Sequence, residues 1–383
     1  MKDHSRHAYT ILHTESSLGW GGQEHRVLAE AKAMRQRGHR VLFACDPRGE
    51  LYRRAGDADF TVIPLVWGGL HNLKSWLALR RLLRWESIEI LNTHSSLDSW
   101  VGALAWRSLR VRPLLVRTRH LSTRVKNNWT TRWLYQAPAA IITTGEVTRE
   151  LLRCHLGVSP QRLFSIPTGV PLDEFAPREK DRHLLAELAI PPGAFVFGTV
   201  AVLRSWKGHL FLLEAFSQLI RGGANAFLVV VGKGPYRGVI EEKVAQLGLK
   251  DCVRLTGHQE DIPWWFSVMD AVVLASYAHE GVPQSVLQAL AMAKPVIGTA
   301  VGGIPEVVLD GETGLLAPPR DPKALAGAMA RLLSDPDLRA VLGRRGRELV
   351  TARFSLERMA AEIEAVYDVL REQQKPAGSR MPA

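Results

Sequence analysis

The chain has 383 residues, of which 46% are hydrophobic and 23% charged, and its formal net charge is +11. This length exceeds a comfortable single hydrophobic core, so we expect two domains of ordinary globular composition. The three cysteines are widely spaced and form no C-x-x-C pair, which argues against a disulfide framework and favours a reducing cytoplasm.

The start of the chain, MKDHSRHAYT, is polar, and no apolar run approaches the roughly 20 residues that a membrane helix needs. We therefore expect neither a signal peptide nor a membrane span. The expected location is the cytoplasm, and a peripheral place at the inner face of the cytoplasmic membrane stays open.

The positive charge lies in the first half of the chain. Residues 1–172 hold 25 Lys and Arg against 13 Asp and Glu, and no acid occurs between Asp98 and Glu146. Such a block attracts an anionic partner, for example a lipid surface, a phosphorylated glycolipid or a nucleic acid. A solvated basic face without a partner is the alternative. The basic residues of the block are Arg107, Arg110, Arg112, Arg117, Arg119, Arg124, Lys126 and Arg132.

Short apolar runs alternate with helical patterns along the first half. Such alternation predicts parallel strands connected by helices. A Gly-rich loop with Gly21 and Gly22 follows the first run and leads into a helix. It lacks the G-x-G-x-x-G spacing of a dinucleotide site, so a plain turn and a phosphate-approaching loop both stay open. The runs expected as strands are residues 9–14, 40–45, 60–65, 88–92, 114–116, 139–143 and 163–167.

Two histidines follow expected strands of this half. His94 lies in NTHSSLDSW and His120 in RTRHLST, each just after an apolar run. Ligands collect at the carboxyl ends of parallel strands, so either residue is a site candidate, although a structural hydrogen-bonding role is commoner for such a histidine. Whether His120 acts as a base is not decided by the sequence.

Residues 73–85, LKSWLALRRLLRW, predict a helix that mixes leucine, tryptophan and arginine. Such a helix is able to lie on an anionic membrane. We favour the alternative, in which it packs on the sheet and its arginines face water. Asp57 and Asp59 form a D-x-D triplet that precedes a strand instead of following one, so we interpret it as a turn and not as a metal site.

The strand and helix pattern restarts after a Pro-rich segment, IPTGVPLDEFAP at 166–177. The expected domains are 1–167, a linker 168–178, a second domain 179–354, a helix 355–373 that returns to the first domain, and a loose tail 374–383. The fold class is α/β, with two doubly wound parallel-sheet domains.

The second half carries two further stretches with site chemistry. LRSWKGH, at 203–209, places Arg204 and Lys207 between a strand and a helix, where two cations and a helix N-terminus suit a diphosphate. Residues 270–304 predict strand, loop, helix and strand, with Glu280 at the carboxyl edge. A carboxylate there is able to accept hydrogen bonds from the hydroxyls of a phosphorylated polyol, such as a sugar nucleotide.

These stretches resemble family 4 glycosyltransferases of the GT-B fold. The resemblance rests on EGVPQSVLQ, VGGIPEVV, GETGLLAPPRD, VGKGPYRGVI and the linker, and it is strongest from Thr168 to Asp321. It implies two facing Rossmann-like domains with a cleft between them, the first binding the acceptor and the second a nucleotide-diphosphate sugar. This chain departs from the family at Gln288, where the family has a second Glu, and in the three-residue spacing of Arg204 and Lys207.

The resemblance also implies roles for individual residues. Arg204 and Lys207 would stabilise the departing diphosphate, Glu280 would orient the donor sugar and Gln288 would hold the ribose. His120 would border the reacting centre. The remaining expected donor-binding residues are Gly21, Gly22, His258, Gly281, Val282 and Pro283. No metal or other cofactor is expected, since the two cations and helix dipoles supply positive charge.

The expected function is a retaining glycosyl transfer from a nucleotide-diphosphate sugar to a glycan or glycolipid, in the synthesis of lipopolysaccharide or another surface glycan. A sugar-nucleotide epimerase of the same fold is one alternative. A glycoside hydrolase would need two carboxylates around one bond, and only Glu280 is evident. A nucleic-acid-binding protein would explain the basic half, but no recognised binding motif accompanies it. The donor base, the sugar, the acceptor and the oligomeric state are not readable from the sequence.

Overall fold

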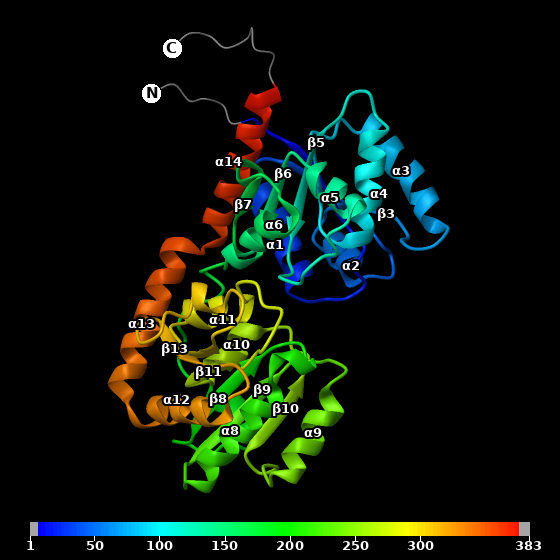
Figure 1. Ribbon diagram of the computed structural model, residues 1–383. Coiled ribbons are helices and arrows are strands. Elements are labelled where there is room, and N and C mark those ends of the chain that lie inside the picture. Colours follow the sequence, from blue (N-terminus) through cyan, green and yellow to red (C-terminus); the bar gives the residue numbers. More distant parts are fainter. Residues whose placement is uncertain (1–6, 375–383) are drawn as a thin grey trace, which may run out of the picture. The chain divides into compact units, whose positions relative to one another are not determined.

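The computed structural model describes residues 7–374, which form two compact units (Figure 1). Of these residues, the N-terminal unit contains 7–169 together with 356–374, and the C-terminal unit is Val170–Ser355. Of the loose tail expected at 374–383, all but Gln374 lies outside the described residues. Within the described residues no helix is long and apolar enough to cross a membrane.

The N-terminal unit is built on a sheet of seven parallel strands in the order β3-β2-β1-β4-β5-β6-β7. The strands are mostly buried, as short β-branched and leucine-rich runs require when helices cover a parallel sheet. The order reverses between β1 and β4, where Leu12 pairs with both Leu42 and Leu91. The strands are β1 (Thr10–Glu15), β2 (Arg40–Cys45), β3 (Thr61–Pro64), β4 (Ile90–Thr93), β5 (Leu114–Arg119), β6 (Ala140–Thr143) and β7 (Leu163–Ser165).

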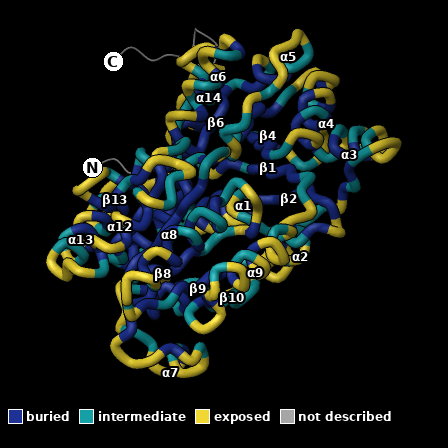
Figure 2. Tube along the Cα trace, turned by 60° about the horizontal axis from the view of Figure 1, so that its bottom comes forward, coloured by how far each residue is buried: buried dark blue, intermediate teal, exposed yellow. Residues whose placement is uncertain are grey.

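Seven helices accompany this sheet among the described residues, and their outward faces are exposed (Figure 2). The last, α14, packs its apolar face into the same core as α1, and the Tyr9 hydroxyl donates to Asp368 at 2.5 Å. The helices are α1 (Gly22–Gln36), α2 (Glu50–Asp57), α3 (His71–Trp85), α4 (Ser96–Arg107), α5 (Trp129–Gln136), α6 (Glu146–Leu156) and α14 (Leu356–Gln374).

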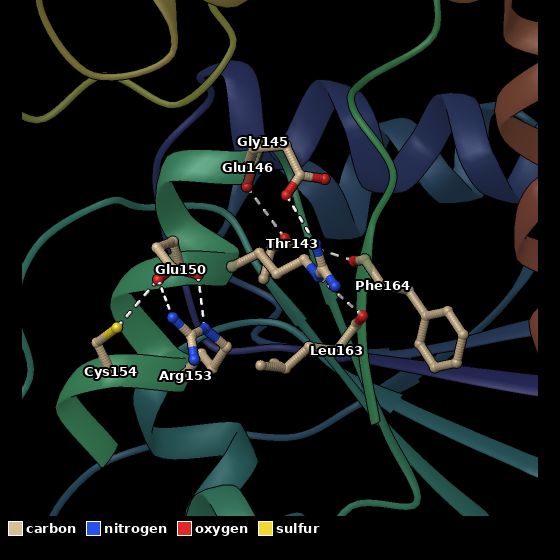
Figure 3. Close-up of polar contacts among 9 residues, drawn as sticks. Thr143, Gly145, Glu146, Glu150, Arg153, Cys154, Leu163 and Phe164 are labelled. Atoms are coloured by element: carbon tan, nitrogen blue, oxygen red, sulfur yellow. Dashed lines mark hydrogen bonds and ion pairs between the residues drawn. The ribbon is translucent and has the colours of Figure 1, made fainter. Parts of the chain in front are cut away.

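Helix α6 illustrates how a helix of this unit is attached to its strands (Figure 3). The Thr143 hydroxyl, at the end of β6, donates to the carbonyls of Gly145 and Phe164 at 3.2 and 3.4 Å. On the exposed side, Glu150 pairs with Arg153 one turn on and accepts from the Cys154 thiol at 3.0 Å. The inner contacts fix the β6–α6 turn, whereas the outer ones are surface pairs of small energetic value.

The C-terminal unit has a six-stranded parallel sheet in the order β10-β9-β8-β11-β12-β13, which reverses between β8 and β11. Two apolar clusters cover its faces. The strands are β8 (Phe195–Val200), β9 (Ala226–Val231), β10 (Val253–Gly257), β11 (Ala271–Leu274), β12 (Val296–Thr299) and β13 (Gly314–Ala317). The helices are α7 (Arg182–Glu187), α8 (His209–Arg221), α9 (Arg237–Gln246), α10 (Ile262–Ser267), α11 (Gln284–Ala291), α12 (Pro322–Ser334) and α13 (Pro336–Arg353).

Two parallel sheets with covering helices confirm the α/β, Rossmann-like class that the sequence predicts. The D-x-D triplet does not form a site: Asp57 ends α2, and Asp59 follows with a left-handed φ of 58°. Arg117, counted above in the basic block, is buried and stacks over the Tyr135 ring at 4.3 Å, so it adds nothing to a surface charge.

Candidate active site

The clearest group of candidate catalytic side chains lies at the carboxyl edge of the C-terminal sheet. Strands β8 and β11 are neighbours there, so the loops that follow them emerge together at the point where the strand order reverses. This is the place where open α/β sheets bind ligands. The loop after β8 brings Arg204 and Lys207, and the loop after β11 brings Glu280.

Lys207 and Glu280 form an ion pair at this edge. The Lys207 Nζ lies 2.6 Å from Glu280 Oε1, and the buried Ser276 hydroxyl donates to the same oxygen at 2.6 Å. Both side chains are largely shielded from water, with 19% and 7% exposure, so the pair is a built feature and not a surface contact. Sequence reasoning selected both charged residues but missed Ser276, whose only signal is its place two residues after a buried strand.

Backbone segments approach one another unusually closely around this pair. A Cβ on Gly208, where φ is +71°, would lie 1.8 Å from the Ala275 carbonyl oxygen, and one on Gly302 would lie 2.1 Å from that of Glu280. The Gly303 amide donates to the Glu280 carbonyl at 3.2 Å. The position of Glu280 is therefore set by neighbouring main chain that leaves no room for side chains.

The segment after Glu280 leads directly into α11. Gly281 is half-buried, Val282 belongs to the hydrophobic core, and Pro283 is the residue before the helix. Gln288 is half-buried in the middle of α11. The first amide groups of this helix have no partners within it, as at every helix start, and its positive dipole end lies beside Glu280 in the chain.

Two predicted residues lie apart from the ion pair. Arg204 is exposed, and its guanidinium stacks over the Trp206 ring at 5.0 Å. His258 follows β10, two strands away from β8, and its exposed ring lies 3.4 Å from Glu260. The structure thus brings Lys207 and Glu280 into contact, while Arg204 and His258 contact other residues.

The carboxyl edge of the N-terminal sheet is lined by histidines. His13 Nδ1 lies 2.9 Å from His94 Nε2, and His94 Nδ1 lies 3.0 Å from His120 Nε2. His13 lies in β1, and His94 and His120 directly follow the neighbouring strands β4 and β5, so the three rings form one hydrogen-bonded chain. Burial lowers the pKa of His13 to about 3 and those of His94 and His120 well below the usual value. All three are therefore neutral at pH 7.

Two buried carboxylates, Asp98 and Glu15, lie beside these linked histidines. Asp98 accepts from the His94 amide at 2.8 Å and from the Thr14 hydroxyl at 3.0 Å. Glu15 accepts from Gln23 and from the Ser95 hydroxyl. Burial, and for Glu15 also the charge of Asp98, raises the pKa of both acids. Sequence reasoning missed His13 and Glu15, since a polar residue inside a buried strand gives no distinct pattern. It also missed Asp98, whose place in the first turn of α4 is an ordinary one for an acid.

The glycine pair of the first loop has an ordinary backbone. Gly21 is extended at the start of α1, its amide donates to Glu24 at 2.8 Å, and Gly22 is the first helical residue. Neither residue has a positive φ. Across residues 7–374, no group of three or more His, Cys, Asp or Glu side chains is arranged to hold a metal ion.

Two family models match the chain. Residues 20–174 match "Glycosyltransferase Family 4", and residues 181–349 match "Glycosyl transferases group 1". The alpha-D-kanosaminyltransferase of Streptomyces kanamyceticus is 29% identical over 246 residues, 62% of each chain. The UDP-Gal:alpha-D-GlcNAc-diphosphoundecaprenol alpha-1,3-galactosyltransferase of Escherichia coli is 26% identical over 78% of this chain and 80% of its own length. The chain spans 62 to 66% of the length of the first curated relatives it matches.

Solved glycosyltransferase structures superpose on this chain over nearly its whole length. A glycosyltransferase from Rickettsia africae superposes with a TM-score of 0.86 at 21% identity, over 96% of this chain and 100% of that one. Anabaena Alr3699/HepE in complex with UDP-glucose gives 0.81 at 20% identity, over 94% and 99%. Taken with the two family matches, which cover most of the residues, these similarities show that the chain belongs to the group 1 and family 4 glycosyltransferases and has the GT-B fold.

Proposed function

We propose that the protein is a retaining glycosyltransferase that moves a sugar from a nucleotide-diphosphate sugar to a glycan or glycolipid. The observation that carries the proposal is the shielded Lys207–Glu280 pair beside two helix starts. A cation, free amide groups and a carboxylate are the groups that a diphosphate and a sugar hydroxyl require. The galactosyltransferase of Escherichia coli, whose name gives a nucleotide-sugar donor and a lipid-linked acceptor, supports this substrate class.

In the proposed mechanism Lys207, with Arg204 nearby in the chain, neutralises the departing diphosphate. Stabilising charge that develops only as the bond breaks lowers the barrier without tightening ground-state binding. Glu280 accepts hydrogen bonds from the donor sugar, and Gln288 offers an amide oxygen to the ribose. From the N-terminal unit, the proposal assigns His120 a place beside the reacting sugar, as the family resemblance implies. No metal or other cofactor is required in this proposal.

A screen of UDP, GDP and ADP by thermal shift tests the donor part of the proposal. A ligand that binds only the folded protein raises its unfolding midpoint, so we expect one diphosphate to raise it most. Lys207→Ala should reduce that rise, whereas Lys250→Ala, an exposed lysine before β10, should leave it unchanged. No response to any of the three diphosphates would contradict the proposal. Product analysis without added acceptor then separates a transferase from an epimerase.

We also propose that the acceptor is a glycolipid and that helix α3 contacts the anionic membrane carrying it. Leu70 is 92% exposed and Trp85 74% exposed, and Leu73 and Leu77 lie between them at helical spacing. The exposed cations Lys74, Arg81 and Arg84 share that spacing, and no acid occurs in α3. A helix that lies on an anionic lipid surface typically combines apolar side chains with basic ones in this way.

Vesicle sedimentation tests the membrane part. We expect binding to phosphatidylglycerol vesicles at low salt, weaker binding at 0.5 M salt, and none to phosphatidylcholine alone, because each basic residue near the surface contributes about 1 kcal/mol. Exchanging Lys74, Arg81 and Arg84 for glutamine together should abolish binding. Lys250→Gln, in the C-terminal unit, serves as the control. Absence of binding at low salt would remove this part of the proposal.

A further inference from the structure

The hydrogen bonds between the three histidines restrict which nitrogen of each ring is protonated. A neutral imidazole has one N–H, on Nδ1 or on Nε2, and its other nitrogen accepts. Each link in the chain joins an Nδ1 to an Nε2, at 2.9 Å between His13 and His94 and 3.0 Å between His94 and His120. Each link needs one hydrogen. The three rings must therefore all carry the hydrogen on Nδ1, or all carry it on Nε2.

The environment of His13, the buried end of the row of three histidines, distinguishes these two arrangements. His13 is fully buried, its ring stacks on Phe43 at 5.6 Å, and its Nε2 has no hydrogen-bond partner among the described residues. If every hydrogen were on Nε2, His13 would bury an N–H without an acceptor. If every hydrogen is on Nδ1, His13 buries only an unused lone pair. Orphaned buried N–H groups are the rarer of the two in folded proteins.

We infer that His13, acting through His94, holds His120 in the neutral tautomer with its hydrogen on Nδ1. His120 then accepts from His94 at Nε2 and presents an N–H donor at its remaining nitrogen. A general base needs a free lone pair at the position that takes the proton, and His120 has none in this tautomer. His120 is thus a hydrogen-bond donor to an oxygen, and His13 and His94 are positioning residues. Only the catalytic consequence rests on the proposed function.

The surrounding charges agree with a neutral chain. Arg26 and Arg119 both act on His120 to lower its pKa, and Arg26 does the same to His94. Asp98 contacts His94 only through the backbone amide, at 2.8 Å, and offers no counterion to an imidazolium ring. A proton passed inward along the chain would end on His13, where burial alone opposes the charge. The chain therefore sets a tautomer and does not conduct protons.

Ring-nitrogen NMR of the full chain labelled with ¹⁵N-histidine tests the inference without any activity assay. At pH 7.5 we expect His120 to show a protonated Nδ1 and an unprotonated Nε2, with no titration between pH 6 and 8.5. A protonated Nε2 on His120 in the wild-type protein would overturn the inference. The signals are assigned with His13→Phe, His94→Phe and His120→Asn, and wild-type data suffice if a variant does not fold.

The His13→Phe variant tests the positioning role, since a phenyl ring fills the space beside Phe43 but supplies no hydrogen. We expect His120 to populate both tautomers in this variant. An unchanged His120 tautomer would show that His13 does not set it. His71→Phe, which removes an exposed histidine of the same unit, should leave the His120 signals in place.

Once glycosyl transfer has been measured, two substitutions at His120 distinguish a hydrogen-bond donor from a general base. The asparagine of His120→Asn supplies an N–H near the same position but is no base, whereas the leucine of His120→Leu supplies neither. We expect roughly 10-fold loss of kcat for the former and roughly 100-fold or more for the latter, the usual effect of removing one donor. Equal losses would overturn the donor role. Absence of transfer in the wild-type protein would instead contradict the proposed function and leave the NMR result standing.

Discussion

The carboxyl edges of the two sheets are built in opposite ways. In the N-terminal unit, side chains fill the edge: the buried His13 and His94, the half-buried His120 linked to them, and the buried Glu15 and Asp98 beside them. In the C-terminal unit, main chain fills the edge, because glycines at 208, 302 and 303 let the loops that follow the strands approach one another closely. The charged pair Lys207–Glu280 is set among these loops.

This difference indicates what each edge is suited to bind. Closely packed loops at helix starts present amide groups at fixed positions, which suits a phosphate, and they depend little on pH. A network of buried titratable side chains is suited to recognising hydroxyls one by one, and its state changes with pH. The comparison therefore predicts that the two units respond differently to substitution and to pH.

The largest expected effect comes from filling the space at Gly302. Gly302→Ala places a methyl group 2.1 Å from the Glu280 carbonyl oxygen at a φ of +56°, so the loop must move. We expect the C-terminal unit to lose roughly 3 kcal/mol of stability, and the shift with nucleotide diphosphate to disappear. Thermal unfolding with and without the nucleotide measures both.

Gly238→Ala is the matched control for this substitution. Gly238 lies in helix α9 of the same unit, and nothing lies within 4 Å of an added Cβ. There the alanine should raise stability by about 0.5–1 kcal/mol and leave the nucleotide response unchanged. An undiminished nucleotide shift in Gly302→Ala would mean that this loop does not hold the ligand.

A second effect, of intermediate size, is the pH dependence of the N-terminal unit. The pKa of Glu15 is raised to about 8 and that of Glu30 to about 7, chiefly by burial. In the unfolded chain both acids lose their proton near pH 4.5, so between pH 4.5 and 8 the folded unit binds more protons. The contribution of these two acids to stability therefore falls as pH rises through this window.

Histidine acts in the opposite direction at lower pH. The pKa of His13 is lowered from 6.5 to about 3, so its contribution to stability is lost as the pH falls from 6.5 toward 3. His94 and His120 act in the same direction as His13, and all three still offset part of the loss just above pH 6.5. The acids outweigh the histidines above pH 6.5, and we expect the N-terminal unit to lose roughly 1 kcal/mol between pH 6.5 and 8, at 1.36 kcal/mol per pKa unit. Hydrogen exchange, corrected for intrinsic rates, reports each unit separately.

The C-terminal unit and one variant serve as controls for this slope. The C-terminal unit holds His209, with a pKa lowered to about 4, and Lys294, with a pKa lowered to about 8, and neither destabilises it as pH rises from 6.5 to 8. Glu15→Gln should flatten the slope of the N-terminal unit, whereas Glu150→Gln, on the exposed face of α6, should not. Equal slopes in the two units would contradict the comparison.

The sequence predicts the C-terminal edge better than the N-terminal edge, for physical reasons. Lys207 and Glu280 each stand in a loop between a buried strand and a helix, and such loops are recognisable from local pattern. Their contact spans 73 positions and follows only from the strand order, which no local pattern gives. His13 lies within an apolar strand, where its partners across the sheet are invisible in the sequence.

Two short helices of the N-terminal unit, α2 and α5, are not among the elements that the sequence predicts, and the reason is similar. Helices α2 and α5 are eight residues each, and α2 buries only Leu51 and Ala55. With so few apolar positions, a helical period is hard to distinguish from a loop. The strands of the N-terminal unit, in contrast, are predicted within a few residues of their ends, because burial on both faces of a parallel sheet demands continuous apolar runs.

The smallest expected effect concerns a single hydroxyl in the side-chain network. Ser95 donates to Glu15, and this bond lowers the pKa of that acid against the effect of burial. Ser95→Ala should therefore raise the pKa of Glu15 further and cost about 1 kcal/mol of stability near pH 8. Carboxyl ¹³C NMR titration measures the shift, and Ser108→Ala, which removes a hydroxyl bonded to the Ala105 carbonyl, should leave it unchanged. If the Glu15 titration did not move, the acid would be governed by burial alone, and the N-terminal edge would be a set of separate buried groups instead of a connected network.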